Sequence, residues 1–141
     1  LNLFNSVFMG FDEGGVFFDG AVVQGDTANF TYKNNVFTGV TKLVEPVTLN
    51  AWFTSYNNSL LPNPNDVLLK APYNQNSPIL IPQAGSVLLS GASFTDPKVA
   101  DPFFTPVSYR GAFSGNGAER WDIGWANFDP QGAYYGSADL V

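Results

Sequence analysis

Aromatic side chains are the residues of this sequence with the clearest capacity to bind a ligand. Two of its three tryptophans, Trp121 and Trp125, lie four residues apart in an aromatic segment that covers residues 103–130. Such rings could form a platform on which sugar rings stack. The residues that could contribute are Trp52, Tyr73, Trp121, Trp125, Tyr134 and Tyr135. We single out Trp121, Trp125 and Tyr134 for carbohydrate binding, although we favour a hydrophobic cap over the open end of a stack of strands.

The charged and polar residues offer three weaker candidate sites. Asp12 and Glu13 could be an acid–base pair, but adjacent strand residues point to opposite faces, which favours a solvated turn. The turn at residues 63–66 supplies a single carboxylate, Asp66, for calcium, so a capped turn is favoured there too. Arg110 with Asp101 or Asp122 could imitate the site of a polysaccharide lyase, but we favour a structural ion pair or stacking of Arg110 on a tryptophan.

The composition excludes several kinds of catalysis. The chain of 141 residues has no histidine and no cysteine. This excludes Ser-His-Asp and Cys-His catalysis within the chain, and it removes the commonest zinc ligands. We therefore expect no enzymatic activity, no cofactor and no metal.

The charge pattern limits which kinds of partner and which cellular location we expect. The net charge is −6, and the six basic residues are scattered singly, so we expect no binding to nucleic acid. No apolar run approaches the roughly 20 residues of a membrane helix, so we expect no membrane insertion. Charged residues make up only 13% of the chain. The surface must then be neutral and polar, which is typical of extracellular or cell-surface all-β proteins.

An internal repeat gives the main indication of the fold. Residues 1–10 align with residues 30–39 at a constant offset of 29, which matches Asn5 with Asn34 and also Val-Phe and Gly at equivalent positions. A repeat of this length is typical of stacked coils. Asn tolerates the left-handed conformation that a corner between two strands requires. We expect Asn5 and Asn34 to occupy equivalent corners and to form a structural ladder through their side-chain amides.

The rest of the chain has a different character. Prolines interrupt the strand-like pieces of residues 40–92, and no segment shows the pattern of an amphipathic helix. We therefore predict one continuous all-β domain. Residues 1–44 form about two coils of a short right-handed parallel β-helix. Residues 45–141 form a coil extension and an irregular, strand- and loop-rich aromatic cap.

Three motifs support a family resemblance. They are the proline-led run from Pro78 to Phe94, the strand Tyr109-Arg-Gly-Ala-Phe113 and the ending Trp121-x3-Trp125-x2-Phe128-Asp-Pro130. Together they resemble the C-terminal region of large exported right-handed parallel β-helix surface proteins of Bacteroidetes-type bacteria. This resemblance implies an exported protein and supplies no catalytic residues. Val87 stands where the family often has proline.

These observations lead to three functional hypotheses. The first is a non-catalytic extracellular structural or adhesion module, the C-terminal part of an exported β-helix cell-surface or filament protein. The second is a carbohydrate-binding or polysaccharide-lyase-like β-helix with catalytic residues upstream, and the third is a fibre subunit that assembles by strand addition. We also expect the chain to be a fragment or a processed product. Upstream chain of the same protein or a partner subunit would then cover its N-terminal end, and glycans would be a further class of partner.

Overall fold

The computed structural model describes residues 1–11, 13–20 and 29–134, so Asp12 and Tyr135 lie outside the described residues. Short strands and little helix make up the regular structure, which confirms the prediction of a β-rich fold. The strands are β1 (Asn2–Phe4), β2 (Val7–Met9), β3 (Gly14–Phe17), β4 (Thr31–Lys33), β5 (Val36–Thr38), β6 (Lys42–Glu45), β7 (Ser59–Leu61), β8 (Leu69–Ala71) and β9 (Ile79–Pro82). The helices within the described residues are the α-helix α2 (Asn50–Ser55) and the 3-10 helices η2 (Val47–Leu49), η3 (Pro64–Val67), η4 (Val87–Leu89) and η5 (Gly117–Glu119).

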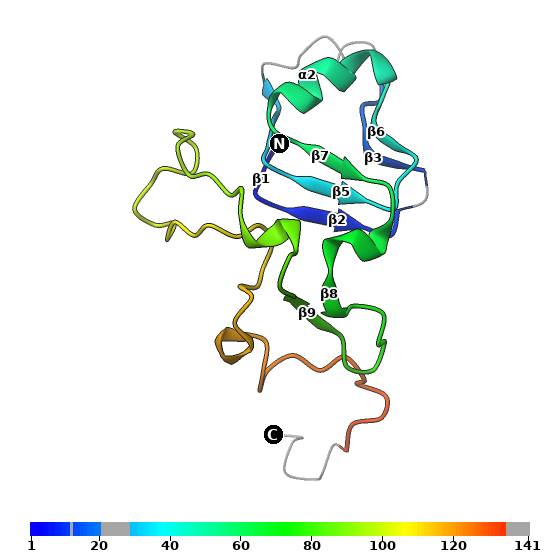
Figure 1. Ribbon diagram of the computed structural model, residues 1–141, viewed down its shortest axis with the longest axis vertical. Helices are drawn as coiled ribbons and strands as arrows, with labels where there is room; N and C mark the ends of the chain where they lie inside the picture. Colours follow the sequence, from blue (N-terminus) through cyan, green and yellow to red (C-terminus); the bar gives the residue numbers. More distant parts are fainter. Residues whose placement is uncertain (12, 21–28, 135–141) are drawn as a thin grey trace.

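The first six strands pair in parallel and in the order in which they occur. β1 pairs with β4, β2 with β5 and β3 with β6, and Figure 1 shows β2 beside β5 and β3 beside β6. In the second pair Val7 lies opposite Val36 and Phe8 opposite Phe37, so the strands align as the sequence repeat does. The chain therefore returns to lie beside itself after 29 residues instead of folding back as a hairpin.

The pairing continues beyond the repeat. β7 adds to the free side of β5 in parallel, with Leu60 opposite Phe37. The segment predicted to extend the coils, from residue 45 onward, therefore contributes a third layer to one of the paired sheets. We use the term paired-strand region for residues 1–61.

Asparagines in the left-handed conformation turn the chain at equivalent corners. The φ angles are 52° at Asn5 and 60° at Asn34, and Asn57, just before β7, has a φ of 65°. This confirms the predicted left-handed conformation at the first two corners. Asparagine suits these positions because its short polar side chain lowers the cost of a positive φ.

Aromatic side chains fill the interior of the paired-strand region. Phe37 and Phe53 are fully buried, and Tyr32 and Phe18 are 4% exposed. Helix α2 supplies Phe53 and also Trp52, whose ring lies edge-on to Phe18 at 5.9 Å between centroids. The expectation of no helix is wrong here. Six residues are too short for a helical pattern to show in the sequence, and burial of one face stabilises the helix.

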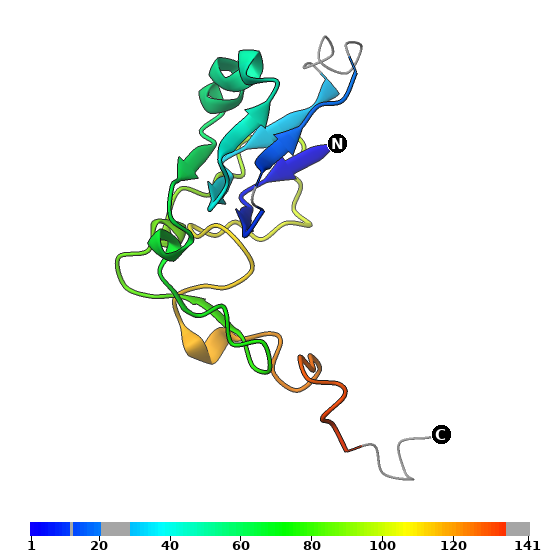
Figure 2. The same cartoon turned by 90° about the vertical axis from the view of Figure 1, so that its right-hand side faces the viewer.

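The remainder of the chain contains little regular structure. β8 and β9 form an antiparallel pair, and residues 83–134 contain only short helical turns. Figures 1 and 2 show that residues 113–134, which we call the C-terminal segment, extend past this hairpin and away from the parallel strands. Residues 92–112, which we call the flanking segment, instead return to the N-terminal strands.

Candidate functional site

A groove of about 710 Å³ lies between the N-terminal strands and the flanking segment. Residues 2–7 form one wall, which includes β1, the corner at Asn5 and the start of β2. The opposite wall is mostly apolar and comprises Phe94, Lys98, Val99, Phe104, Val107 and Tyr109. Lys98 is the one charged residue among those that line the groove.

The corner residue Asn5 holds the flanking segment in place. Its Nδ2 donates to the carbonyl oxygen of Ser93 at 3.0 Å, and its Oδ1 accepts from the Ser93 backbone N–H at 3.0 Å. The Asn5 carbonyl oxygen also accepts from the backbone N–H of Gly111 at 2.7 Å. Both ends of the flanking segment are thus bonded to one residue.

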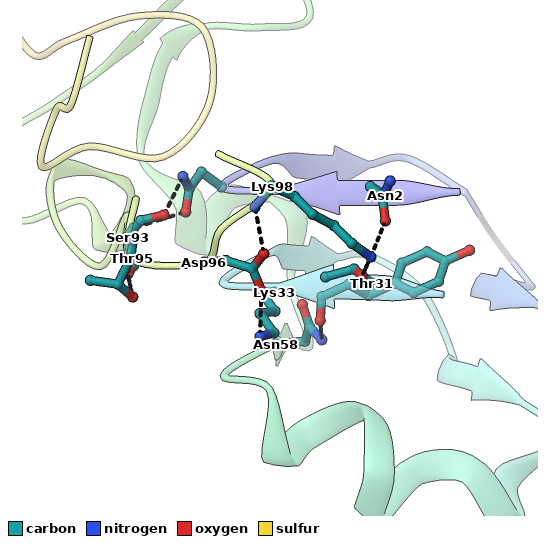
Figure 3. A network of polar contacts seen from close by, with 10 residues as sticks. Asn2, Thr31, Lys33, Asn58, Ser93, Thr95, Asp96 and Lys98 are labelled. Carbon is teal, nitrogen blue, oxygen red and sulfur yellow. Dashed lines mark hydrogen bonds and ion pairs between the residues drawn. The ribbon is translucent and has the colours of Figure 1, made fainter. Parts of the chain in front are cut away.

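Two lysines and one aspartate form a second connection, shown in Figure 3. Lys33 forms an ion pair with Asp96 at 2.7 Å, and Lys98 Nζ donates to Asn2 Oδ1 at 2.9 Å and to Thr31 Oγ1 at 2.6 Å. The hydrogen bond from Lys33 lowers the pKa of Asp96, and the bond from the Lys98 backbone N–H adds to this effect. Lys98 therefore spans β1 and β4 without a carboxylate bonded to its ammonium group.

A ladder of asparagine side-chain amides lies in the buried interior. Its members are the residues that directly follow the corner asparagines, not the corner asparagines that we predicted. Asn35 is fully buried and Asn58 is 5% exposed. Asn35 Nδ2 donates to Asn58 Oδ1 at 2.9 Å and to the Leu3 carbonyl at 3.1 Å, while its Oδ1 accepts from the Ser6 backbone N–H at 3.0 Å. These bonds join three successive layers of the paired-strand region.

The side chains of Asn5 and Asn34 bond to other residues, so the predicted ladder between these two residues is wrong. Asn34 does take part in an amide pair, but its Oδ1 accepts from Asn57 Nδ2 at 3.2 Å. Asn5 is bonded to Ser93 instead. Side chains at these left-handed corners point outward, where the flanking segment and solvent offer competing partners. The following residue points inward, where no water competes.

The predicted aromatic site is split between two places. Phe113, Trp121 and Trp125 form a stacked row, with ring centroids 5.3 Å and 5.4 Å apart. Trp121 therefore stacks on two rings, whereas Trp125, which is 69% exposed, stacks on Trp121 alone among the described residues. Trp52 belongs to the interior cluster with Phe18 and Tyr32, so it is not part of the same surface.

The tryptophans do not form the predicted cap. Trp121 is 53% exposed, Trp125 69% and Tyr134 93%, and none of them belongs to the core clusters of the paired strands. Their segment is anchored locally, because Trp121 Nε1 donates to the Ala112 carbonyl and Trp125 Nε1 to the Trp121 carbonyl. The flanking segment, rather than the tryptophans, approaches the edge of the first strands.

The polar candidate residues have structural partners. Arg110 donates to the carbonyl oxygens of Ser90 and Val87, at 3.0 and 2.8 Å, and Asp122 pairs with Arg120. Arg110 therefore forms no ion pair with Asp101 or Asp122 in the structure, so the predicted pair is wrong. Burial lowers the pKa of Arg110, and the hydrogen bond from Arg120 lowers the pKa of Asp122.

The turn considered as a calcium site is capped by one of its own side chains. Asn63 caps η3, since its side chain accepts from the backbone N–H of Asn65 at 2.9 Å. Among the residues that the structure describes, no three His, Cys, Asp or Glu side chains gather as metal ligands would. Within the same residues, no helix has the length and hydropathy needed to cross a membrane.

Searches among protein families, curated proteins and solved structures found no match to this chain. Sequence reasoning missed Asn35, Asn58, Ser93 and Lys98. A signal for the first two was present, because Asn-Asn pairs at residues 34–35 and 57–58 stand at equivalent corners.

Proposed function

We propose that this chain is a non-catalytic structural module, the C-terminal part of an exported β-helix cell-surface or filament protein. In this proposal residues 1–61 are the last coils of a short right-handed parallel β-helix. The observation that carries it is the parallel pairing of three successive strands with the next three, at the offset of the sequence repeat. Right-handed connections between parallel strands of one sheet are the strong general preference.

The polar interior supports a scaffold role. The Asn35–Asn58 bond and the backbone bonds of the same residues fix each layer against the next. A buried amide with all its partners costs little, but a shift in register would leave it unpaired. Such an interior favours a rigid, repetitive support rather than a site that changes shape.

Immunogold electron microscopy of intact cells that produce the protein tests this proposal. Antibodies raised against the chain should label the outer surface of cells that have not been permeabilised, or filaments that leave them. A cytosolic protein serves as the control for cell integrity. Label that appears only after permeabilisation would contradict the proposal.

Carbohydrate binding is the second candidate function, and the exposed ring of Trp125 favours it. Trp125 is 69% exposed, and its indole N–H donates to the Trp121 carbonyl, so the ring is held in a fixed orientation. A glycan array should then show binding that Trp125→Ala abolishes. Phe103→Ala is the matched control, because Phe103 is also exposed, at 85%, and lies outside this row. Equal binding by both variants, or no binding by the native chain, would exclude this role for Trp125.

A further inference from the structure

A second hollow, of about 370 Å³, lies at the corners of the paired-strand region. We call it the corner hollow. Three parts of the chain line it: residues 33–34 at the corner after β4, residues 55–57 at the corner before β7, and residues 93 and 95–97 of the flanking segment. No residue of β1 or β2 is among the lining residues, so the walls do not depend on what adjoins the first strands.

The charges in the corner hollow balance. Its charged residues are Lys33 and Asp96, which bond to each other at 2.7 Å (Figure 3). The second oxygen of Asp96 accepts from the backbone N–H of Lys98 at 3.0 Å. An ionic ligand would find no unpaired opposite charge here, because the cation and the carboxylate already satisfy each other. The hollow therefore favours a neutral ligand.

The corner amides offer hydrogen-bonding groups of both kinds. Asn34 and Asn57 have left-handed backbones, and Asn57 Nδ2 donates to Asn34 Oδ1 at 3.2 Å. This bond leaves Nδ2 of Asn34 and Oδ1 of Asn57 without a protein partner among the described residues. One donor and one acceptor suit two neighbouring hydroxyl groups of a ligand, because a hydroxyl group can both donate and accept.

Tyr56 adds an aromatic surface to this polar lining. Its ring lies edge-on to Trp52, with 5.8 Å between centroids, and Lys33 Nζ lies 5.1 Å from the ring centroid. Tyr56 nevertheless remains 37% exposed. A sugar presents apolar C–H groups to an aromatic ring and hydroxyl groups to the polar side chains around it. The lining of the corner hollow combines both kinds of surface.

The walls are held in place by the fold itself. The Asn34 N–H donates to the Tyr56 carbonyl at 3.0 Å, and Ser93 is bonded twice to Asn5. Binding to walls that are already ordered loses little conformational entropy. The volume lies near the lower end of the range of about 300–1,000 Å³ that is typical of small-molecule sites. The hollow therefore suits a monosaccharide or a disaccharide rather than a long chain.

We propose that the corner hollow is a binding site for a neutral sugar, which packs on Tyr56 and bonds through adjacent hydroxyl groups to Asn34 and Asn57. This site goes beyond the proposed scaffold role. It is also separate from the exposed ring of Trp125, which does not line the hollow.

Titration of neutral sugars into the ¹⁵N-labelled full chain tests the proposal. The probes are the methyl α-glycosides of glucose, mannose and galactose, and the disaccharides maltose, cellobiose and lactose. At least one of them should give saturable shifts of the amide signals of Asn34, Tyr56 and Asn57. The uronic acid that corresponds to the best probe should bind about tenfold more weakly, because its carboxylate loses water and gains no free cation.

Variants of the lining residues locate the site. Tyr56→Ala should weaken binding of the best probe about tenfold, whereas Tyr56→Phe keeps the ring and should bind nearly as well as the native chain. Asn57→Gly should also weaken binding about tenfold, and glycine accepts the φ of 65° at that corner, so the fold is preserved. Tyr73→Ala and Asn76→Gly are the matched controls, because both residues are exposed and lie outside the hollow. We expect neither control to change the affinity.

Several results would overturn the inference. These are no saturable shifts with any of the probes, equal affinity for the neutral sugar and its uronic acid, or undiminished binding by Tyr56→Ala and Asn57→Gly. Binding that only Trp125→Ala abolishes would assign sugar recognition to the C-terminal segment instead. A surface-located protein that ignores the probes would overturn this inference alone. A cytosolic protein that binds them would overturn the proposed function alone.

Discussion

Aromatic residues of the paired-strand region and of the C-terminal segment occupy opposite environments. Phe37 and Phe53 are fully buried between layers, whereas Trp121 and Trp125 stack on each other and remain 53% and 69% exposed. Both regions are rich in aromatic rings, so composition does not explain the difference. Repetition does, because each layer of the paired-strand region covers the side chains of the layer before it, and the C-terminal segment has no second copy of itself.

The largest expected effect tests this difference directly. Phe37→Ala removes a ring that contacts both Phe8 and Phe53, and it should lower the free energy of unfolding by about 3–5 kcal/mol. Trp125→Ala removes a larger ring from an exposed stack and should cost about 0.5–1 kcal/mol. Urea unfolding followed by circular dichroism measures both. Similar costs for the two variants would mean that the two regions are not packed as differently as their exposure indicates.

The next effect concerns the polar interior. Asn35→Ala leaves the Ser6 N–H without its acceptor and removes the side-chain bonds to the Leu3 carbonyl and to Asn58 Oδ1, so it should cost about 2–3 kcal/mol. Asn57→Gly is the control, because it removes an exposed amide and glycine accepts the φ of 65° at that corner. We expect the control to cost less than about 0.5 kcal/mol in the same unfolding assay. A small effect of Asn35→Ala would refute the role of the ladder in holding the layers together.

A smaller effect compares the two copies of the repeat. Gly10 and Gly39 are equivalent and both have positive φ, +85° and +68°. A Cβ at Gly39 would lie 2.6 Å from Pro64 Cγ, whereas a Cβ at Gly10 would meet nothing within 4 Å. Gly10→Ala should therefore cost about 1 kcal/mol from backbone strain alone, and Gly39→Ala about 2 kcal/mol or more. Equal melting temperatures for the two variants would contradict the packing of η3 on the second copy.

The smallest effect is a dependence on pH. The pKa of Asp96 is lowered in the folded protein by its bond to Lys33, so the unfolded chain binds the proton more readily. The stability from this pair is present above the unfolded pKa of about 3.9 and is lost as the pH falls below it. Exposed pairs contribute about 0.2–1 kcal/mol. Asp96→Asn should reduce the acid sensitivity of unfolding between neutral pH and pH ~2.5, as urea unfolding at the two pH values measures.

The repeat made the register of the first strands predictable. Matching Val7 with Val36 and Phe8 with Phe37 in the sequence predicted which residues lie opposite each other, and the structure confirms it. The third layer was not predictable in this way. β7 pairs with β5 at an offset of 23, and its residues Ser59, Leu60 and Leu61 do not resemble Val36, Phe37 and Thr38. Backbone hydrogen bonds form that pairing. They do not require particular side chains, so the sequence does not indicate the pairing.

The candidate site was harder to predict than the fold. Ser93 and Lys98 lie in a stretch without a repeat, and their partners Asn5 and Asn2 are 88 and 96 residues away. Such contacts depend on the path by which an irregular segment comes back to the N-terminal strands. No local sequence pattern predicts that path. The tryptophans misled the prediction for a related reason. Their spacing indicates a cluster, but spacing cannot say whether a cluster covers the paired strands or one side of a surface segment.

The two hydrogen bonds between Asn5 and Ser93 have a consequence for the order in which the protein folds during its synthesis. Asn5 leaves the ribosome well before its partner, which emerges 88 residues later. At typical translation rates of about 5–20 residues per second, the corner waits several seconds for that partner. During this interval the groove lacks the wall that the flanking segment supplies, so the N-terminal strands stay uncovered on that side until residue 93 has been made.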